Sequence, residues 1–89
     1  MSLIANILTV AKDGVPRTHL MYKANLSHRM LSVYVTFLLE RGFIEEKKNG
    51  DYIRPTVYVT TELGLKYLKI YNSLLELADG LSVFMPFSS

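Results

Sequence analysis

The sequence contains no cysteine. Disulfide bonds, thiolate metal sites and cysteine nucleophiles are therefore excluded, and their absence fits a reducing cytoplasm. Long apolar runs are also missing, because no stretch approaches the roughly 20 residues that a membrane-spanning helix needs. The first residues lack the basic segment and the small-residue cleavage site of a signal peptide. These absences together predict a soluble protein of the cytoplasm.

Recognisable catalytic groupings are missing as well. There is no glycine-rich phosphate loop, and Ser27 and His28 lack the orienting carboxylate that a catalytic triad requires. His19 and His28 are too few to bind a metal ion without further ligands. Glu45 and Glu46 fit the solvated end of a strand better than a catalytic pair. We therefore expect no enzyme activity, no metal site and no cofactor.

Hydrophobic residues are abundant: they make up 49% of the 89 residues, whereas charged residues make up 20%. This composition describes one compact domain near the lower size limit for a self-sufficient core, so association between copies would help. The formal charge is +2, but residues 12–41 hold five basic and two acidic residues together with both histidines. This part of the chain therefore favours an anionic partner.

Two helices are expected at the start of the chain. Ser2 can cap the first, because apolar residues recur behind it at helical spacing, and Gly14 is a plausible stop. Pro16 suits the first turn of a short second helix at 17–22, since a first-turn residue needs no N–H partner.

A tight turn and a third helix follow. Asn25 ends a turn that begins at Lys23, because Asn tolerates the left-handed backbone, and Ser27 caps a helix that spans 27–41. One face of this helix is apolar and consists of Leu31, Tyr34, Val35, Leu38 and Leu39. The opposite face consists of Arg29, Ser32, Val33 and Thr36. Two helices joined in this way form the helix-turn-helix pattern.

A long β-hairpin is expected between residues 43 and 60. Gly42 ends the third helix, and Asn49–Gly50 is the strongest short hairpin dipeptide. Pro55 cannot donate to a strand ladder, so it marks an edge position or a break in the return strand. We expect the tip of this hairpin to be mobile.

Thr60 or Thr61 caps a fourth helix that runs to about Ala78 and carries two neighbouring apolar stripes. The first stripe consists of Leu63, Tyr67, Ile70, Leu74 and Leu77, and the second of Gly64, Leu68, Tyr71, Leu75 and Ala78. One stripe can cover its own domain while the other binds a second copy. Alternatively, both stripes are buried within one subunit. The apolar tail at 80–89 either folds over a partner or is disordered.

This order of elements is that of a winged helix. The stretch MYKANLSHRMLSVYVTFLLERGFIEE resembles small archaeal winged-helix DNA-binding proteins, which include viral members and dimerise through a long C-terminal helix. VYVTTELGLKYLKIYNSLLEL resembles the last strand, threonine cap and dimer helix of that family. The wing departs from the family, because residues 47–56 separate its legs where a shorter turn is common. The resemblance implies a mainly α fold with a β-hairpin wing (α+β) and a homodimer that binds double-stranded DNA.

The expected organisation is a winged helix-turn-helix domain at 1–60, a dimerisation helix at 61–79 and the tail at 80–89. The candidates for reading DNA bases are Ser27, His28, Arg29, Ser32, Val33 and Thr36. The candidates for phosphate contacts are Arg17, Thr18, Lys23, Lys47, Lys48 and Arg54. The candidates for the dimer interface are Leu63, Tyr67, Ile70, Tyr71, Leu74, Leu75 and Leu77. Arg29 would read a guanine edge, and Val33 would touch a thymine methyl group.

Three functions stay open at this point: a transcriptional regulator, an architectural protein that binds DNA without sequence preference, and a protein-interaction module. Lys47 and Lys48 illustrate the ambiguity, because lysines also protect hairpin edges from pairing. The salt dependence of duplex binding separates a DNA-binding protein from an adaptor. No small-molecule ligand is implied.

Overall fold

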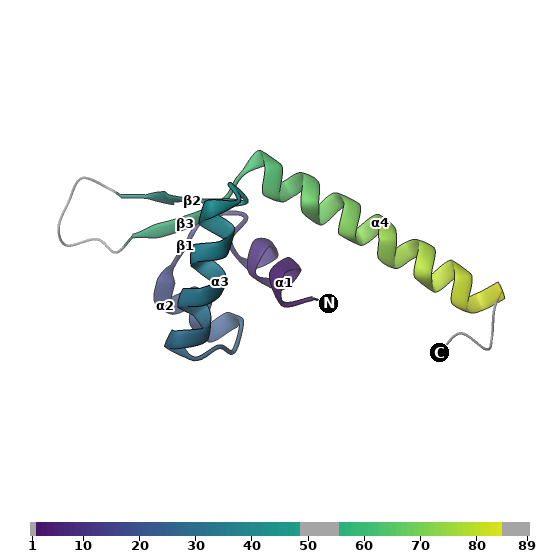
Figure 1. The fold of residues 1–89 in the computed structure, drawn as a ribbon, viewed down its shortest axis with the longest axis horizontal. Coiled ribbons are helices and arrows are strands. Elements are labelled where there is room, and N and C mark those ends of the chain that lie inside the picture. Colours follow the sequence, from purple (N-terminus) through teal and green to yellow (C-terminus); the bar gives the residue numbers. More distant parts are fainter. Residues whose placement is uncertain (1, 49–55, 85–89) are drawn as a thin grey trace.

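The computed structural model describes residues 2–48 and 56–84 of the chain. The elements, in order, are α1 (Leu3–Val10), β1 (Val15–Pro16), α2 (Arg17–Lys23), α3 (His28–Glu40), β2 (Ile44–Lys47), β3 (Val57–Thr60) and α4 (Glu62–Phe84). Figure 1 shows the first three helices and the sheet gathered into one body, from which α4 extends. The expected fold, mainly α with a β-hairpin wing, is confirmed.

The helix caps follow the polar residues that the sequence places before each apolar run. The Ser2 hydroxyl accepts a hydrogen bond from the Ala5 amide at 3.1 Å, and the Ser27 hydroxyl accepts one from the Met30 amide at 3.1 Å. Asn25 has a φ of 54°, as its place in the turn predicts. Helix α1 ends at Val10, earlier than expected, and α2 extends one residue further, to Lys23.

The three strands form an antiparallel sheet in the order β1-β3-β2. Ile44 pairs with Thr60 in the hairpin, and Val15 pairs with Tyr58 on the other side of β3. Strand β1 was not predicted from the sequence, because two residues carry no periodic signal. Pro16 closes this edge strand and occupies the N-cap position of α2 rather than its first turn, since an edge strand tolerates a residue without an N–H donor.

The core lies where α1, α2, α3 and the sheet meet. The largest side chains buried there are Ile7, Leu8, Leu20, Leu31, Leu38 and Ile44. The apolar face predicted for the third helix is confirmed, because Val35 is buried as well and both Tyr34 and Leu39 pack against the core. This packing turns the opposite face of α3 away from the protein.

Two threonines and a glycine join α4 to the body. Thr61 is the cap, because its hydroxyl accepts a hydrogen bond from the Gly64 amide at 3.2 Å. Thr60 is buried instead, and its hydroxyl donates to the Leu8 carbonyl at 2.7 Å. Gly64 and Leu68 are also buried, and the Tyr71 hydroxyl accepts a hydrogen bond from the Ser2 amide at 2.7 Å. The first half of α4 therefore packs on its own body.

Helix α4 continues to Phe84, although the sequence placed its end near residue 78 and a separate tail from 80 onward. Gly80 lies inside the helix, where a single glycine costs only about 1 kcal/mol, and no proline follows before Pro86. The predicted Asn49–Gly50 turn, Arg54 and Pro55 lie outside the described residues, as does the tail after residue 84. Within the described ranges, none of the helices has both the length and the apolar character needed to cross a membrane.

Candidate nucleic-acid interface

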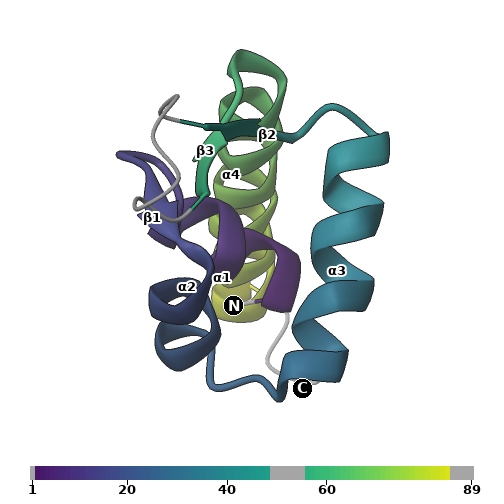
Figure 2. The same ribbon diagram turned by 90° about the vertical axis from the view of Figure 1, so that its left-hand side faces the viewer.

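The outer face of α3 is open to solvent along the length of the helix. The cap residue Ser27 and the side chains of His28, Arg29, Val33 and Thr36 are all exposed. Figure 2 shows α3 standing along one side of the body, with α1 beside its inner face. Five of the six predicted base-reading residues are therefore accessible on one surface, and the sixth, Ser32, is half-buried.

Ser32 belongs to a short hydrogen-bond chain that links α2 to α3. Its hydroxyl donates to the carbonyl of His28 at 3.0 Å, within its own helix. The same hydroxyl accepts a hydrogen bond from the guanidinium of Arg17 at the start of α2. The structure thus joins a predicted phosphate residue to a predicted base-reading residue, and Ser32 holds the Arg17 side chain beside the outer face of α3.

The other predicted phosphate residues lie at separate places on the surface. Thr18 and Lys23 are exposed on α2, whereas Lys47 and Lys48 are exposed at the end of β2 in the wing. Arg54 is the remaining candidate, and it lies outside the described residues. Cationic side chains are therefore exposed on α2 and at the end of β2. Arg29 lies between these two elements in the sequence and is exposed on the outer face of α3.

Sequence reasoning missed two further residues on the outer face of α3. Met30 is 46% exposed, and Phe37 is 36% exposed. Both lie one helical turn from Val33, so the same spacing that defined the outer face would have revealed them. Arg41 was also missed, and its guanidinium lies 5.0 Å from the centre of the Phe37 ring.

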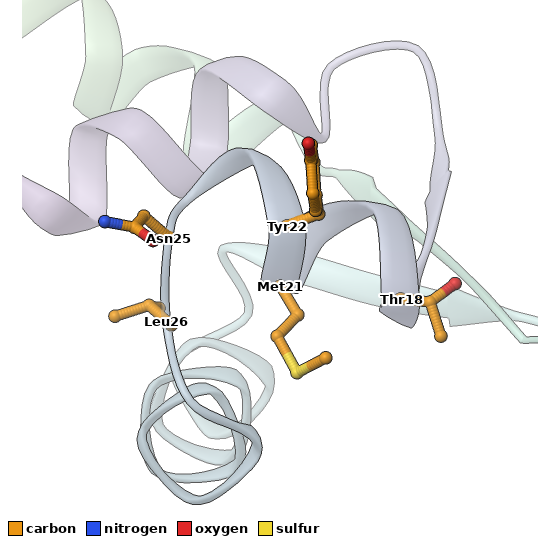
Figure 3. A pocket seen from close by; sticks show the side chains of 5 residues that line it. All are labelled: Thr18, Met21, Tyr22, Asn25 and Leu26. Atoms are coloured by element: carbon orange, nitrogen blue, oxygen red, sulfur yellow. The ribbon is translucent and has the colours of Figure 1, made fainter.

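Tyr22 is the most exposed of the large apolar side chains, at 84%, and it lies beside an open depression on α2. The depression has a volume of about 540 Å³ and is lined by Thr18, Met21, Tyr22, Asn25 and Leu26. Figure 3 shows the Met21 and Tyr22 side chains pointing to opposite sides of the helix. No histidine, carboxylate or cationic side chain lines the depression.

Helix α4 presents an apolar stripe that its own body leaves uncovered. The exposed residues of this free stripe are Leu63, Ile70, Leu74 and Leu77. Leu75, which belongs to the second predicted stripe, is exposed as well. Tyr67 and Tyr71, also predicted at the dimer interface, pack partly against their own core and stack on each other at 6.4 Å. Their assignment to a dimer is therefore weaker than that of the free stripe.

Possible metal ligands do not gather on the described surface. Among residues 2–48 and 56–84, no group of three or more histidine, cysteine, aspartate or glutamate side chains could hold a metal ion. The chemistry available at α3 is that of hydrogen bonding, cationic charge and apolar contact.

The chain belongs to the winged helix-turn-helix family, whose model matches residues 1–79. It is similar to an uncharacterized protein of Methanocaldococcus jannaschii, with 40% identity over 78 residues that cover 86% of this chain and 70% of that protein. The expected resemblance to archaeal winged-helix proteins is thereby confirmed.

Solved structures share the fold at low sequence identity. The PcaV transcriptional regulator from Streptomyces coelicolor matches with a TM-score of 0.74 and 19% identity, over 100% of this chain and 63% of that chain. ZitR from Lactococcus lactis, solved in complex with DNA, matches with a TM-score of 0.71 and 16% identity, over 100% of this chain and 63% of that chain. Sso10a-2, a DNA-binding protein from Sulfolobus solfataricus, matches with a TM-score of 0.59 and 20% identity, over 93% of this chain and 92% of that chain. The chain thus spans less than two thirds of PcaV and of ZitR.

Proposed function

We propose that this chain forms a twofold homodimer that binds double-stranded DNA through α3 and regulates transcription. The observation that carries the proposal is the open outer face of α3 in a winged helix-turn-helix chain, with cationic side chains on the elements beside it. A helix with such a face fits the major groove, which is wide enough to admit one α-helix.

In this arrangement the cations have two different tasks. Arg29 reads a guanine edge, because its guanidinium projects from the exposed face of α3 and can donate two parallel hydrogen bonds. Arg17, Lys23, Lys47 and Lys48 contact phosphates, together with the hydroxyl of Thr18. Phosphate contacts position the protein on the duplex without conveying sequence. The sequence preference is therefore expected to come from α3.

Pairing through α4 accounts for the free stripe. Exposed apolar side chains at one face of a projecting helix are covered when a second copy packs there. A helix of 23 residues is about 34 Å long, so it offers a second copy a long surface for packing. PcaV is a transcriptional regulator, ZitR was solved in complex with DNA, and Sso10a-2 is a DNA-binding protein, so these neighbours support the proposal by analogy.

An architectural protein without sequence preference is the second candidate function. The chain covers 92% of the small DNA-binding protein Sso10a-2 but only 63% of the regulator PcaV. A compact DNA-binding protein of this length therefore has a structural precedent.

Binding to DNA of random sequence tests the proposal and separates the two candidates. Fluorescence anisotropy with a labelled duplex should show affinity that falls steeply as salt rises, because phosphate contacts release counterions. Selection from a random pool should enrich palindromic sites with half-sites about one helical turn apart for a regulator. Binding without enrichment would support the architectural candidate. Absence of duplex binding at low salt would refute both and leave a protein-interaction module.

A further inference from the structure

We infer that the centre of the outer face of α3 recognises the C5-methyl groups of thymine, so that the base pairs facing this centre are A·T. This inference rests on the proposed DNA binding and specifies which feature of the duplex α3 reads. It is carried by an exposed apolar patch at the centre of α3, defined by Met30, Val33 and Phe37 and called the methyl-reading patch below.

Val33 is the centre of this patch. It is 62% exposed. Met30 and Phe37 lie three residues before and four residues after it, so their side chains adjoin it on the helix surface. Arg29 and Thr36 adjoin it on the other side by the same spacing. The most central position of the outer face is thus apolar rather than hydrogen-bonding.

The polar groups of the same face are fewer than the sequence suggested. Ser32 uses its hydroxyl proton on the His28 carbonyl and accepts from Arg17, so it has no donor left for a base. Hydrogen-bonding readout then rests on Ser27, His28, Arg29 and Thr36. An apolar patch beside so few polar side chains is complementary to a base edge that carries a methyl group.

Thymine is the base that presents an apolar group in the major groove, because its methyl group lies there beside the O4 acceptor. Charge around the patch fits this partner. Arg29 lies on one side of Val33, and Arg41 lies over the Phe37 ring at 5.0 Å. The Arg41 guanidinium is then placed to contact a phosphate that borders the groove, whereas Arg29 keeps its role at a base edge. Glu40 is exposed near the end of the helix and opposes close approach there, so the contact centres on the first turns of α3.

Replacing thymine by uracil removes the methyl group and keeps the Watson–Crick pair, so it tests the inference directly. Two duplexes about two helical turns long are compared by anisotropy, one of alternating dA and dT and the other of alternating dA and dU. Each buried methyl group contributes about fourfold in affinity. We expect the uracil duplex to bind about fifteenfold more weakly, because each of the two protomers loses one methyl contact.

Methylation supplies the reverse test. When 5-methylcytosine replaces cytosine in a duplex of alternating dG and dC, the duplex gains a methyl group at the same position in the major groove. The methylated duplex should bind a few-fold more tightly for each methyl group that becomes buried. The salt dependence of binding should be the same for the thymine and uracil duplexes, and the same for the cytosine and 5-methylcytosine duplexes, because the phosphates do not change.

Val33→Ala shortens the side chain at the centre of the patch and should reduce the preference for thymine over uracil to about threefold or less. Leu65→Ala is the matched control, because Leu65 is an exposed leucine of α4 outside the patch, and its thymine preference should stay unchanged. Equal binding of the thymine and uracil duplexes by the unaltered protein would overturn the inference alone. Failure to bind any of the duplexes would refute the proposed DNA binding itself.

Discussion

The backbone of Phe43 lies directly against Gly64 in the first turn of α4. A β-carbon on Gly64 would come within 2.3 Å of the Phe43 carbonyl oxygen and within 2.6 Å of the Thr60 methyl group. A side chain at this position therefore meets backbone that cannot move without shifting the start of β2. The contact sets how closely α4 approaches the body, and with it the direction in which the free stripe is presented.

Gly64→Ala should lower the free energy of unfolding by about 1–3 kcal/mol through overpacking, although alanine is favoured over glycine in helices by about 1 kcal/mol. Urea denaturation followed by circular dichroism measures the change. Asn72→Ala, at an exposed position of the same helix, is the control and should leave stability unchanged or slightly raised. An unchanged or increased stability of Gly64→Ala would contradict the close contact.

Thr60→Val should destabilise the fold by about 1–3 kcal/mol, because it removes the buried hydroxyl that donates to the Leu8 carbonyl at the end of α1. Thr9→Val removes a hydroxyl that bonds the Ala5 carbonyl at the same distance, 2.7 Å, but from an exposed residue. Water can replace that bond, so thermal denaturation should separate the two variants clearly. Equal losses of stability in the two variants would show that burial of the Thr60 hydroxyl does not increase its contribution to the free energy of unfolding.

Ile70→Glu should convert the proposed homodimer to monomers, because it places a charge in the middle of the free stripe. Sedimentation velocity across a range of protein concentrations measures the mass. Leu65→Glu is the control, since Leu65 is exposed on a different side of α4, and the dimer should persist. A monomeric mass for the unaltered protein at all concentrations would exclude pairing through α4.

Arg29→Ala should weaken binding to a selected site by about 1–3 kcal/mol and should affect random duplex less. The reason is that a guanidinium that reads a base edge contributes most where the matching base is present. Anisotropy titrations at one salt concentration compare the two duplexes, and Lys69→Ala on α4 controls for the loss of one exposed positive charge. Equal losses on selected and random DNA would assign Arg29 to phosphates.

Arg17→Ala and Ser32→Ala should weaken duplex binding non-additively, because Ser32 acts by holding the Arg17 guanidinium. The double variant should bind no more weakly than Arg17→Ala alone, and Arg17→Ala should reduce the salt slope by about 1. The control is the pair of Arg17→Ala with Thr36→Ala, an exposed residue of α3 without this contact, which should be additive. Additive losses for Arg17 and Ser32 would show that Ser32 contacts DNA independently.

The helix-turn-helix unit was predictable from the sequence because its causes are local. Asn25 takes the left-handed conformation, and Ser27 caps α3 through an amide three residues away. The apolar spacing of α3 selects which face is buried, and the observed helix, His28–Glu40, matches the prediction apart from its cap residues. Each of these signals acts within a few residues, so no tertiary contact is needed to interpret it.

Other features depend on partners that are distant in the chain. Strand β1 exists because Val15 meets Tyr58, which lies far along the sequence. The choice between Thr60 and Thr61 as the cap was settled by which hydroxyl reaches the Leu8 carbonyl. In the same way, the Ser2 amide binds Tyr71 and draws that side chain toward its own body.

The sequence by itself determined the family, the order of the helices and the hairpin, and most of the outer face of α3, because periodicity, caps and turn residues act locally. Only the tertiary structure decided that Ser32 is bonded to Arg17 and that one stripe of α4 remains free. It also showed that the centre of the α3 face is apolar and flanked by arginines. The physical reason is that hydrogen bonding and burial depend on which groups meet in space, and a linear pattern specifies only which side of an element each residue occupies.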